Sequence, residues 1–132
     1  MYKLEKTGNI FYHTFGGFVS EQEMQGWIAE SEKLLPGMKG QKFYVFADLR
    51  ELKPLAPAAG ELMAKGQEMY QKAGLERSVV ILADAVTTMQ FQRIAKQSGV
   101  SAHERYIDAS SHANFKDMGH DWLIHAKDPD NN

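Results

Sequence analysis

The sequence contains no cysteine among its 132 residues. Disulfide scaffolds, thiolate zinc sites and cysteine nucleophiles are therefore excluded. It also lacks any apolar run close to the roughly 20 residues that a membrane-spanning helix needs. The segment Met1–Lys6 lacks the features of a signal peptide. We therefore expect a cytoplasmic protein.

Neither sign of charge is in large excess. Lysine and arginine number 15 and aspartate and glutamate 17, which gives a net charge of -2. A nucleic-acid binder driven by bulk charge would need a clear basic excess, so no nucleic-acid partner is expected. With 43% hydrophobic residues the chain can form a core, and its length suits one domain. We expect that domain to span residues 1–127, with a flexible tail at 128–132.

Apolar runs and helical stripes alternate along the chain. Strands are predicted at 2–6, 9–15, 42–48, 79–83 and 104–108. Helices are predicted to open at Ser20, before Ala59, at Asp84 and at Ser110 or Ser111. The nearly continuous apolar run at 42–48 is typical of a strand buried on both faces. The order predicts an α/β fold with a single-layer mixed, largely parallel sheet of about five strands and four helices.

Three of the predicted strands end in an aspartate, namely Asp48, Asp84 and Asp108. Ligands of open α/β sheets bind beyond the carboxyl ends of the strands, so these residues and Arg50 define a candidate cleft. Three converging carboxylates would be able to hold Mg²⁺ for phosphate chemistry. The competing interpretation is that each aspartate caps a helix or a turn, where its side chain accepts backbone N–H bonds. The capping interpretation is favoured, because no glycine-rich phosphate loop follows any of these strands.

The helix predicted at 85–98 has apolar residues on two sides. Its inward stripe consists of Thr87, Phe91, Ile94, Ala95 and Ser98. At 100° per residue, Val86 and Met89 fall well off that stripe, on the side of Arg93 and Lys96. These four residues are a candidate contact for an apolar ligand, an anionic lipid surface or a partner helix. The alternative is that Val86 and Met89 fold back over the sheet edge.

No motif in the sequence names a reaction. There is no Gly-x-Ser-x-Gly turn, and no dinucleotide or Walker spacing. Asp117, Asp121 and His125 recur every four residues on the last helix, a pattern that a metal can use, but they lie away from its apolar face and are expected to be solvated. We therefore expect no catalytic residue, no metal and no cofactor, and favour a binding protein over an enzyme.

Several short segments occur in an order that resembles a known family. They are Phe15-Gly16-Gly17-Phe18-Val19-Ser20, Phe46-Ala47-Asp48-Leu49-Arg50, Gly74-Leu75-Glu76-Arg77-Ser78-Val79-Val80, Glu104-Arg105-Tyr106-Ile107-Asp108 and Asp121-Trp122-Leu123. Together they resemble the SpoIIAA-like, or STAS/SEC14-like, bacterial domains over about residues 9–125. The resemblance implies a β-α superhelix related to anti-sigma-factor antagonists and to lipid-binding SEC14 domains.

The sequence departs from the antagonists at their regulatory site. Those proteins carry a phosphorylatable serine or threonine at the start of the helix that follows the Asp-Leu strand end. Here that stretch reads Leu55-Ala56-Pro57-Ala58-Ala59-Gly60, and no serine or threonine occurs from Arg50 to Gly74. A phosphoserine switch needs a hydroxyl at that position, so it cannot operate there.

Three hypotheses on function follow from these observations. The first is a non-catalytic STAS-like binding module for an apolar or lipid-like ligand or a membrane surface. The second is a protein-interaction regulator related to the antagonists but without their phosphorylatable residue. The third is a Mg²⁺-dependent enzyme that uses the strand-end aspartates. A homodimer is also expected to be feasible, because small α/β domains often bury a spare sheet edge or apolar face.

Overall fold

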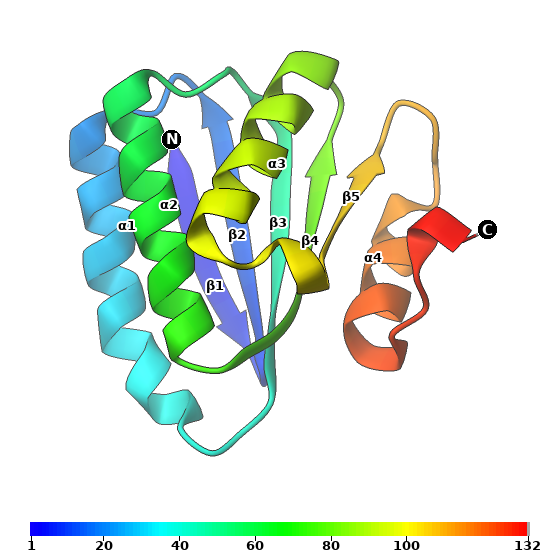
Figure 1. Ribbon diagram of the computed structural model, residues 1–132, viewed down its shortest axis with the longest axis horizontal. Coiled ribbons are helices and arrows are strands. Elements are labelled where there is room, and N and C mark those ends of the chain that lie inside the picture. The colour runs from blue at the N-terminus through cyan, green and yellow to red at the C-terminus, as the bar shows by residue number, and fades with distance from the viewer. Residues whose placement is uncertain (132) are drawn as a thin grey trace.

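One five-stranded sheet organises the chain (Figure 1). The structure, a computed structural model, describes residues 1–131. In space the strands follow their order in the sequence: β1 (Tyr2–Thr7), β2 (Ile10–Gly17), β3 (Phe43–Leu52), β4 (Leu75–Leu82) and β5 (Glu104–Asp108). β1 is antiparallel to β2, and the remaining neighbours are parallel. The predicted single-layer, largely parallel α/β fold is confirmed.

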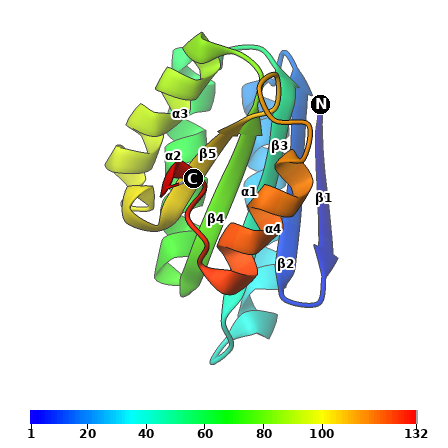
Figure 2. The ribbon, with the colours of Figure 1, turned by 90° about the vertical axis from the view of Figure 1, so that its right-hand side faces the viewer.

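The helices cover the two faces of the sheet unequally. They are α1 (Glu21–Leu34), α2 (Pro57–Lys72), α3 (Ala85–Ser98) and α4 (Phe115–His125), with short 3₁₀ turns η1 (Leu35–Met38), η2 (Ser101–His103) and η3 (Pro129–Asn131). α1, α2 and α3 pack on one face, and α4 alone lies on the other (Figures 1 and 2). On that face His120 of α4 reaches Tyr12 of β2, whereas β1 has no helix of the described chain packed above it.

Two cores result from this arrangement. The larger core lies between the sheet and the three-helix layer, and its most buried large side chains include Phe11, Trp27 and Tyr70. The smaller core lies under α4 and contains Phe46 and Trp122. Strand residues alternate between them because successive side chains point to opposite faces of a sheet.

Local sequence signals explain where several elements begin and end. The predicted capping box is present: the Ser20 side chain accepts the Glu23 N–H, and the Glu23 carboxylate accepts the Ser20 N–H. Gly8, at a φ of 61°, forms the turn between β1 and β2. Gly99, at a φ of 90°, closes α3 in the left-handed region that glycine adopts without strain.

Three predicted boundaries are wrong. β4 begins at Leu75 and not at 79, because its first residues already pair with β3. β3 continues past Asp48 to Leu52, because β2 keeps pairing with it after a register shift, with Gly17 opposite Leu52. The last helix does not start at Ser110 or Ser111. It starts at Phe115 after Asn114, because the Asp108 carboxylate holds both serines in a turn.

Beyond α4 the chain returns to the sheet. The Asp128 carboxylate lies 3.1 Å from Nε of Arg105 on β5. The predicted flexible tail at 128–132 includes this residue, while Asn132 lies outside the described residues. Within residues 1–131 no helix combines the length and the apolar character that crossing a membrane would require.

Candidate functional site

The outer side of α3 carries two exposed apolar side chains. Val86 and Met89 are each 63% exposed. The predicted inward stripe is confirmed, since Thr87, Phe91, Ile94, Ala95 and Ser98 are all buried. The alternative in which Val86 and Met89 fold back over the sheet edge is wrong. The 3.6-residue repeat places these two side chains outward, where no other element covers them.

Arg93 and Lys96 continue the same outer stripe toward the end of α3. Both are exposed, and neither has an ion pair among the described residues. The sequence of α3 contains no aspartate or glutamate. The stripe thus has apolar residues in its first turns and positive charge in its last ones, over about 15 Å at a rise of 1.5 Å per residue.

A third exposed apolar residue lies at the same end of the molecule. Phe18, in the β2–α1 connection, is 67% exposed. Because β2, β3 and β4 are parallel, the connections that follow them meet at one edge of the sheet, the upper end in Figure 1. Phe18, Val86 and Met89 are called the apolar end below.

Hydrogen bonds join the connections of the apolar end. The Lys53 N–H donates to the Gly17 carbonyl at 3.1 Å. The Gln90 side chain bonds both the N–H and the carbonyl of Leu55, at 2.7 and 2.8 Å. The β3–α2 connection is therefore fixed between the loop that carries Phe18 and the first turns of α3.

Sequence reasoning missed Phe18, although a local signal was present. The residue before a helix cap often packs inward against the first turns as a hydrophobic staple. Here Val19 precedes the Ser20 cap and is 2% exposed, and Met24 is fully buried. With Val19 in the staple position, the side chain of Phe18 is left for the surface.

The predicted cleft of carboxylates does not form. Asp48 lies two residues after Phe46 and therefore on the same face of the sheet, under α4, whereas Asp84 caps α3 on the opposite face. Asp108 is engaged by Ser110 and Ser111 in the turn after β5. Across residues 1–131 no three histidine, aspartate or glutamate side chains are arranged to hold a metal ion.

Asp48 and Arg50 do meet, as a local pair. Nε and Nη2 of Arg50 donate to the two oxygens of the Asp48 carboxylate, at 2.9 and 2.8 Å. Partial burial raises the pKa of Asp48, but the Arg50 bonds outweigh it, so the pKa lies below its ordinary value. The two side chains line a shallow hollow beside Gly16 and Glu51. These two cleft candidates are bonded to each other, and within residues 1–131 neither has a hydrogen bond or ion pair with Asp84 or Asp108.

Asp84 is expected to act as a helix cap. Its carboxylate accepts the N–H groups of Val86 and Thr87 and the Thr87 hydroxyl. Changing Asp84 to Ala should lower Tm by roughly 3 °C in a thermal melt, because the first turn of α3 loses these acceptors. Asp84→Asn, which keeps a capping oxygen, should lose much less. Equal losses for the two variants would contradict the capping role.

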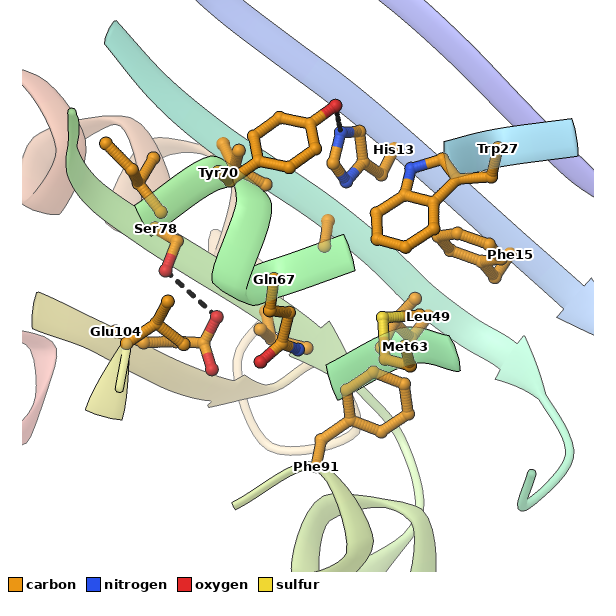
Figure 3. Close-up of a pocket in the computed structure, with 15 residues that line it drawn as sticks. His13, Phe15, Trp27, Leu49, Met63, Gln67, Tyr70, Ser78, Phe91 and Glu104 are labelled. Carbon is orange, nitrogen blue, oxygen red and sulfur yellow. Dashed lines mark hydrogen bonds between the residues drawn. The ribbon is translucent and has the colours of Figure 1, made fainter. Parts of the chain in front are cut away.

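A small cavity lies between the sheet and helices α1 to α3 (Figure 3). It measures about 40 Å³, which is room for only a few water molecules. Small side chains at the middle of the sheet, Ala47 on β3 and Ser78 on β4, leave this space beneath α2. The cavity is far too small for an acyl chain, so a lipid-like ligand inside the fold is not supported.

His13 lies at one end of the cavity, within a buried chain of hydrogen bonds. Its Nε2 is 3.1 Å from the Tyr70 hydroxyl, which is 2.7 Å from the Ser31 hydroxyl. Burial lowers the pKa of His13 to about 3, so the ring is neutral at physiological pH. Burial also raises the pKa of Tyr70. The chain is therefore an uncharged structural network.

Glu104 lies at the other end and is 6% exposed, and no ion pair to its carboxylate is present among residues 1–131. The Ser78 hydroxyl donates to Oε1 at 2.9 Å, and the Tyr106 hydroxyl donates to Oε2 at 2.5 Å. Burial raises the pKa of Glu104 to about 7, although both hydrogen bonds favour the carboxylate. The sequence did not single out this residue, because a glutamate at the start of a strand gives no local sign of burial.

The indole N–H of Trp27 is a buried donor with no partner among the described residues. Trp27 is 1% exposed and borders the same cavity. Unpaired buried donors are rare in proteins. The cavity is wide enough for a water molecule to accept this bond.

Comparison with known proteins gives no family for this chain. No protein-family model matches the sequence, and no curated protein matches it.

Proposed function

We propose that the protein is a non-catalytic STAS-like binding module that contacts an anionic membrane surface through the apolar end. The exposure of Val86 and Met89 carries this proposal, because they lie on one stripe with the unpaired charges of Arg93 and Lys96. The sheet order and the helix succession are compatible with the SpoIIAA-like resemblance, which is itself part of the proposal. Fold alone does not imply function, so the surface is the evidence.

Three kinds of ligand or partner were predicted for this surface, and its positive charge favours an anionic membrane. A partner helix would need a groove, and the apolar side chains instead project from a helix and a loop. Anionic lipid headgroups attract lysine and arginine near the surface by about 1 kcal/mol each. Phe18, Val86 and Met89 would enter the boundary between headgroups and acyl chains while Arg93 and Lys96 contact phosphates.

The expected binding is weak and reversible. Full burial of a valine, methionine or phenylalanine side chain contributes roughly 1.5–3 kcal/mol, and these three are already partly covered. With two basic residues the total is on the order of 5 kcal/mol, which corresponds to a dissociation constant near 0.1–1 mM. A transient contact of this strength suits a module that visits a membrane.

Vesicle co-sedimentation tests the proposal. Wild-type protein should pellet with vesicles of equal parts phosphatidylserine and phosphatidylcholine, and less with phosphatidylcholine alone. Met89→Asp and Phe18→Asp should each reduce the bound fraction about tenfold, because they replace an apolar contact with a repelled charge. Gln41→Asp adds the same charge to an exposed residue of the η1–β3 connection, which enters the sheet at the end opposite the apolar end, and should bind like wild type.

Two results would refute the membrane contact. One is a wild-type protein that stays in the supernatant with anionic vesicles. The other is a Met89→Asp variant, shown to be folded by its thermal melt, that pellets as well as the Gln41→Asp control.

A further inference from the structure

The free edge of β1 is the most accessible strand edge of the sheet. β1 is the outermost strand, and Figure 2 shows it at the right-hand margin with no element beyond it. The opposite edge strand, β5, has η3 packed beside it and the Arg105–Asp128 ion pair alongside. An uncovered edge presents backbone donors and acceptors that another strand can pair with.

The hydrogen-bond pattern with β2 identifies which groups of β1 face outward. Met1 and Gly16 exchange two bonds, Met1 N–H to the Gly16 carbonyl at 2.7 Å and Gly16 N–H to the Met1 carbonyl at 3.0 Å. In an antiparallel ladder such pairs alternate with pairs that exchange none. Lys3 and Glu5 therefore bond to β2. The N–H and carbonyl groups of Tyr2, Leu4 and Lys6 point away from it.

We propose that a second copy of this chain pairs with the free edge of β1, antiparallel and centred on Leu4, to form a homodimer with one continuous sheet. In this register Leu4 exchanges two hydrogen bonds with the partner's Leu4. Tyr2 does the same with the partner's Lys6, and Lys6 with the partner's Tyr2. Every outward-facing group named above then meets an outward-facing group.

The charged side chains of β1 favour this register over its neighbours. Lys3 lies opposite the partner's Glu5, and Glu5 opposite the partner's Lys3, in the pairs where side chains are closest. Centring the pairing on Lys3, Glu5 or Lys6 would instead place two like charges opposite each other, which destabilises a strand pair. Lysines on an edge usually discourage pairing, but here each lysine faces a glutamate or a tyrosine ring.

Both faces of β1 accommodate the partner. Lys3 and Glu5 are exposed on the face that α4 leaves uncovered. Tyr2 and Leu4 are half-buried on the α1 side, so the Leu4 pair adds an apolar contact. One short strand pair buries little surface, and we expect a dissociation constant of roughly 10 µM to 1 mM. The apolar end is at the end of the sheet and not on this edge, so the dimer does not depend on membrane binding.

Sedimentation equilibrium of wild type and two variants tests the charge pairing. Wild type should dimerise within the stated concentration range. Lys3→Glu and Glu5→Lys should each raise the dissociation constant at least about tenfold, because like charges then oppose each other. An equimolar mixture of the two variants should dimerise like wild type. In the mixed dimer, the glutamates of one chain lie opposite the lysines of the other. Both substituted side chains are exposed, so the fold is expected to tolerate them.

Crosslinking tests the register independently. The chain has no cysteine, so each introduced thiol is the only one. Leu4→Cys should form an intermolecular disulfide under mild oxidation, because a bonded pair has a Cα separation of about 5.5 Å. Lys6→Cys should not, because the two copies of residue 6 lie several residues apart. A wild type that stays monomeric, single variants that dimerise like wild type, or crosslinking of Lys6→Cys would overturn the proposal.

Discussion

Replacing Gly66 by alanine is expected to destabilise the protein by about 3 kcal/mol. Gly66 lies in the middle of α2, directly against the indole of Trp27 on α1. A Cβ atom at this position would lie 2.1 and 2.4 Å from two ring carbons of Trp27. Separations this short require the ring or the helices to move, which is the cost of overpacking a core.

Aromatic neighbours hold the Trp27 ring on several sides. It is stacked on Tyr70 with a centroid distance of 6.0 Å, and the rings of His13 and Phe15 meet it edge-on at 5.5 Å each. The gain in helix propensity from glycine to alanine, about 1 kcal/mol, is therefore outweighed by the clash.

Gly60 supplies the matched control on the same helix. A Cβ there would meet only Ile94, at 4.0 Å. Gly60→Ala should therefore stabilise the protein by about 0.5–1 kcal/mol in urea unfolding. In a Trp27→Phe background the cost of Gly66→Ala should fall by at least about 1 kcal/mol, because the smaller ring leaves space. Equal effects of Gly66→Ala and Gly60→Ala would contradict the packing of α1 on α2.

Glu104→Gln is expected to gain about 3 kcal/mol of stability relative to wild type as the pH rises from 4.5 to about 8. The pKa of Glu104 is raised by burial from 4.5 to about 7. Between these values the folded protein holds a proton that the unfolded chain has lost. Stability due to Glu104 therefore falls as the pH rises through this window, and the glutamine variant has no such loss.

His13 acts in the opposite direction and hides part of this effect in wild type. Its pKa is lowered by burial from 6.5 to about 3, so the stability it contributes is lost as the pH falls below 6.5. Between pH 4.5 and 6.5 the two dependences oppose each other. His13 is common to both proteins, and the difference between variant and wild type isolates Glu104.

Urea unfolding of wild type and Glu104→Gln at several pH values measures this difference. The pKa values of Tyr70 and Tyr106 are raised by burial, so neither hydroxyl titrates in the range studied. Ser78→Ala should move the wild-type transition to higher pH, because it removes a hydrogen bond that favours the carboxylate. A variant-minus-wild-type difference that stays constant with pH would show that Glu104 is not buried in this way.

The surface of α3 could be predicted residue by residue from the sequence. The preference of aspartate for helix N-termini identifies Asp84 as the cap. The repeat of 3.6 residues identifies the buried stripe from Thr87 to Ser98 and places Val86 and Met89 on the outer side. These properties belong to one segment, so the segment is sufficient to specify them. The segment does not specify whether another element covers Val86 and Met89. Only the structure shows that no described element does.

The candidate sites that combine several elements could not be predicted in this way. Asp48 and Asp84 follow similar apolar runs, yet one faces α4 and the other caps a helix on the opposite face, because β3 continues beyond Asp48 while β4 ends at Leu82. The length of β3 is set by its pairing with β2, which the residues of β3 do not encode by themselves.

By itself the sequence determined the order of strands and helices, the faces that each buries and the absence of thiol chemistry. Only the tertiary structure decided that Glu104 lies beside Ser78, that His13 meets Tyr70, and that Phe18 shares an end with α3. The physical reason is the separation along the sequence over which each effect acts. Periodicity and capping act within a few residues, whereas these contacts depend on strand register and on how helices α1 to α3 pack over the sheet.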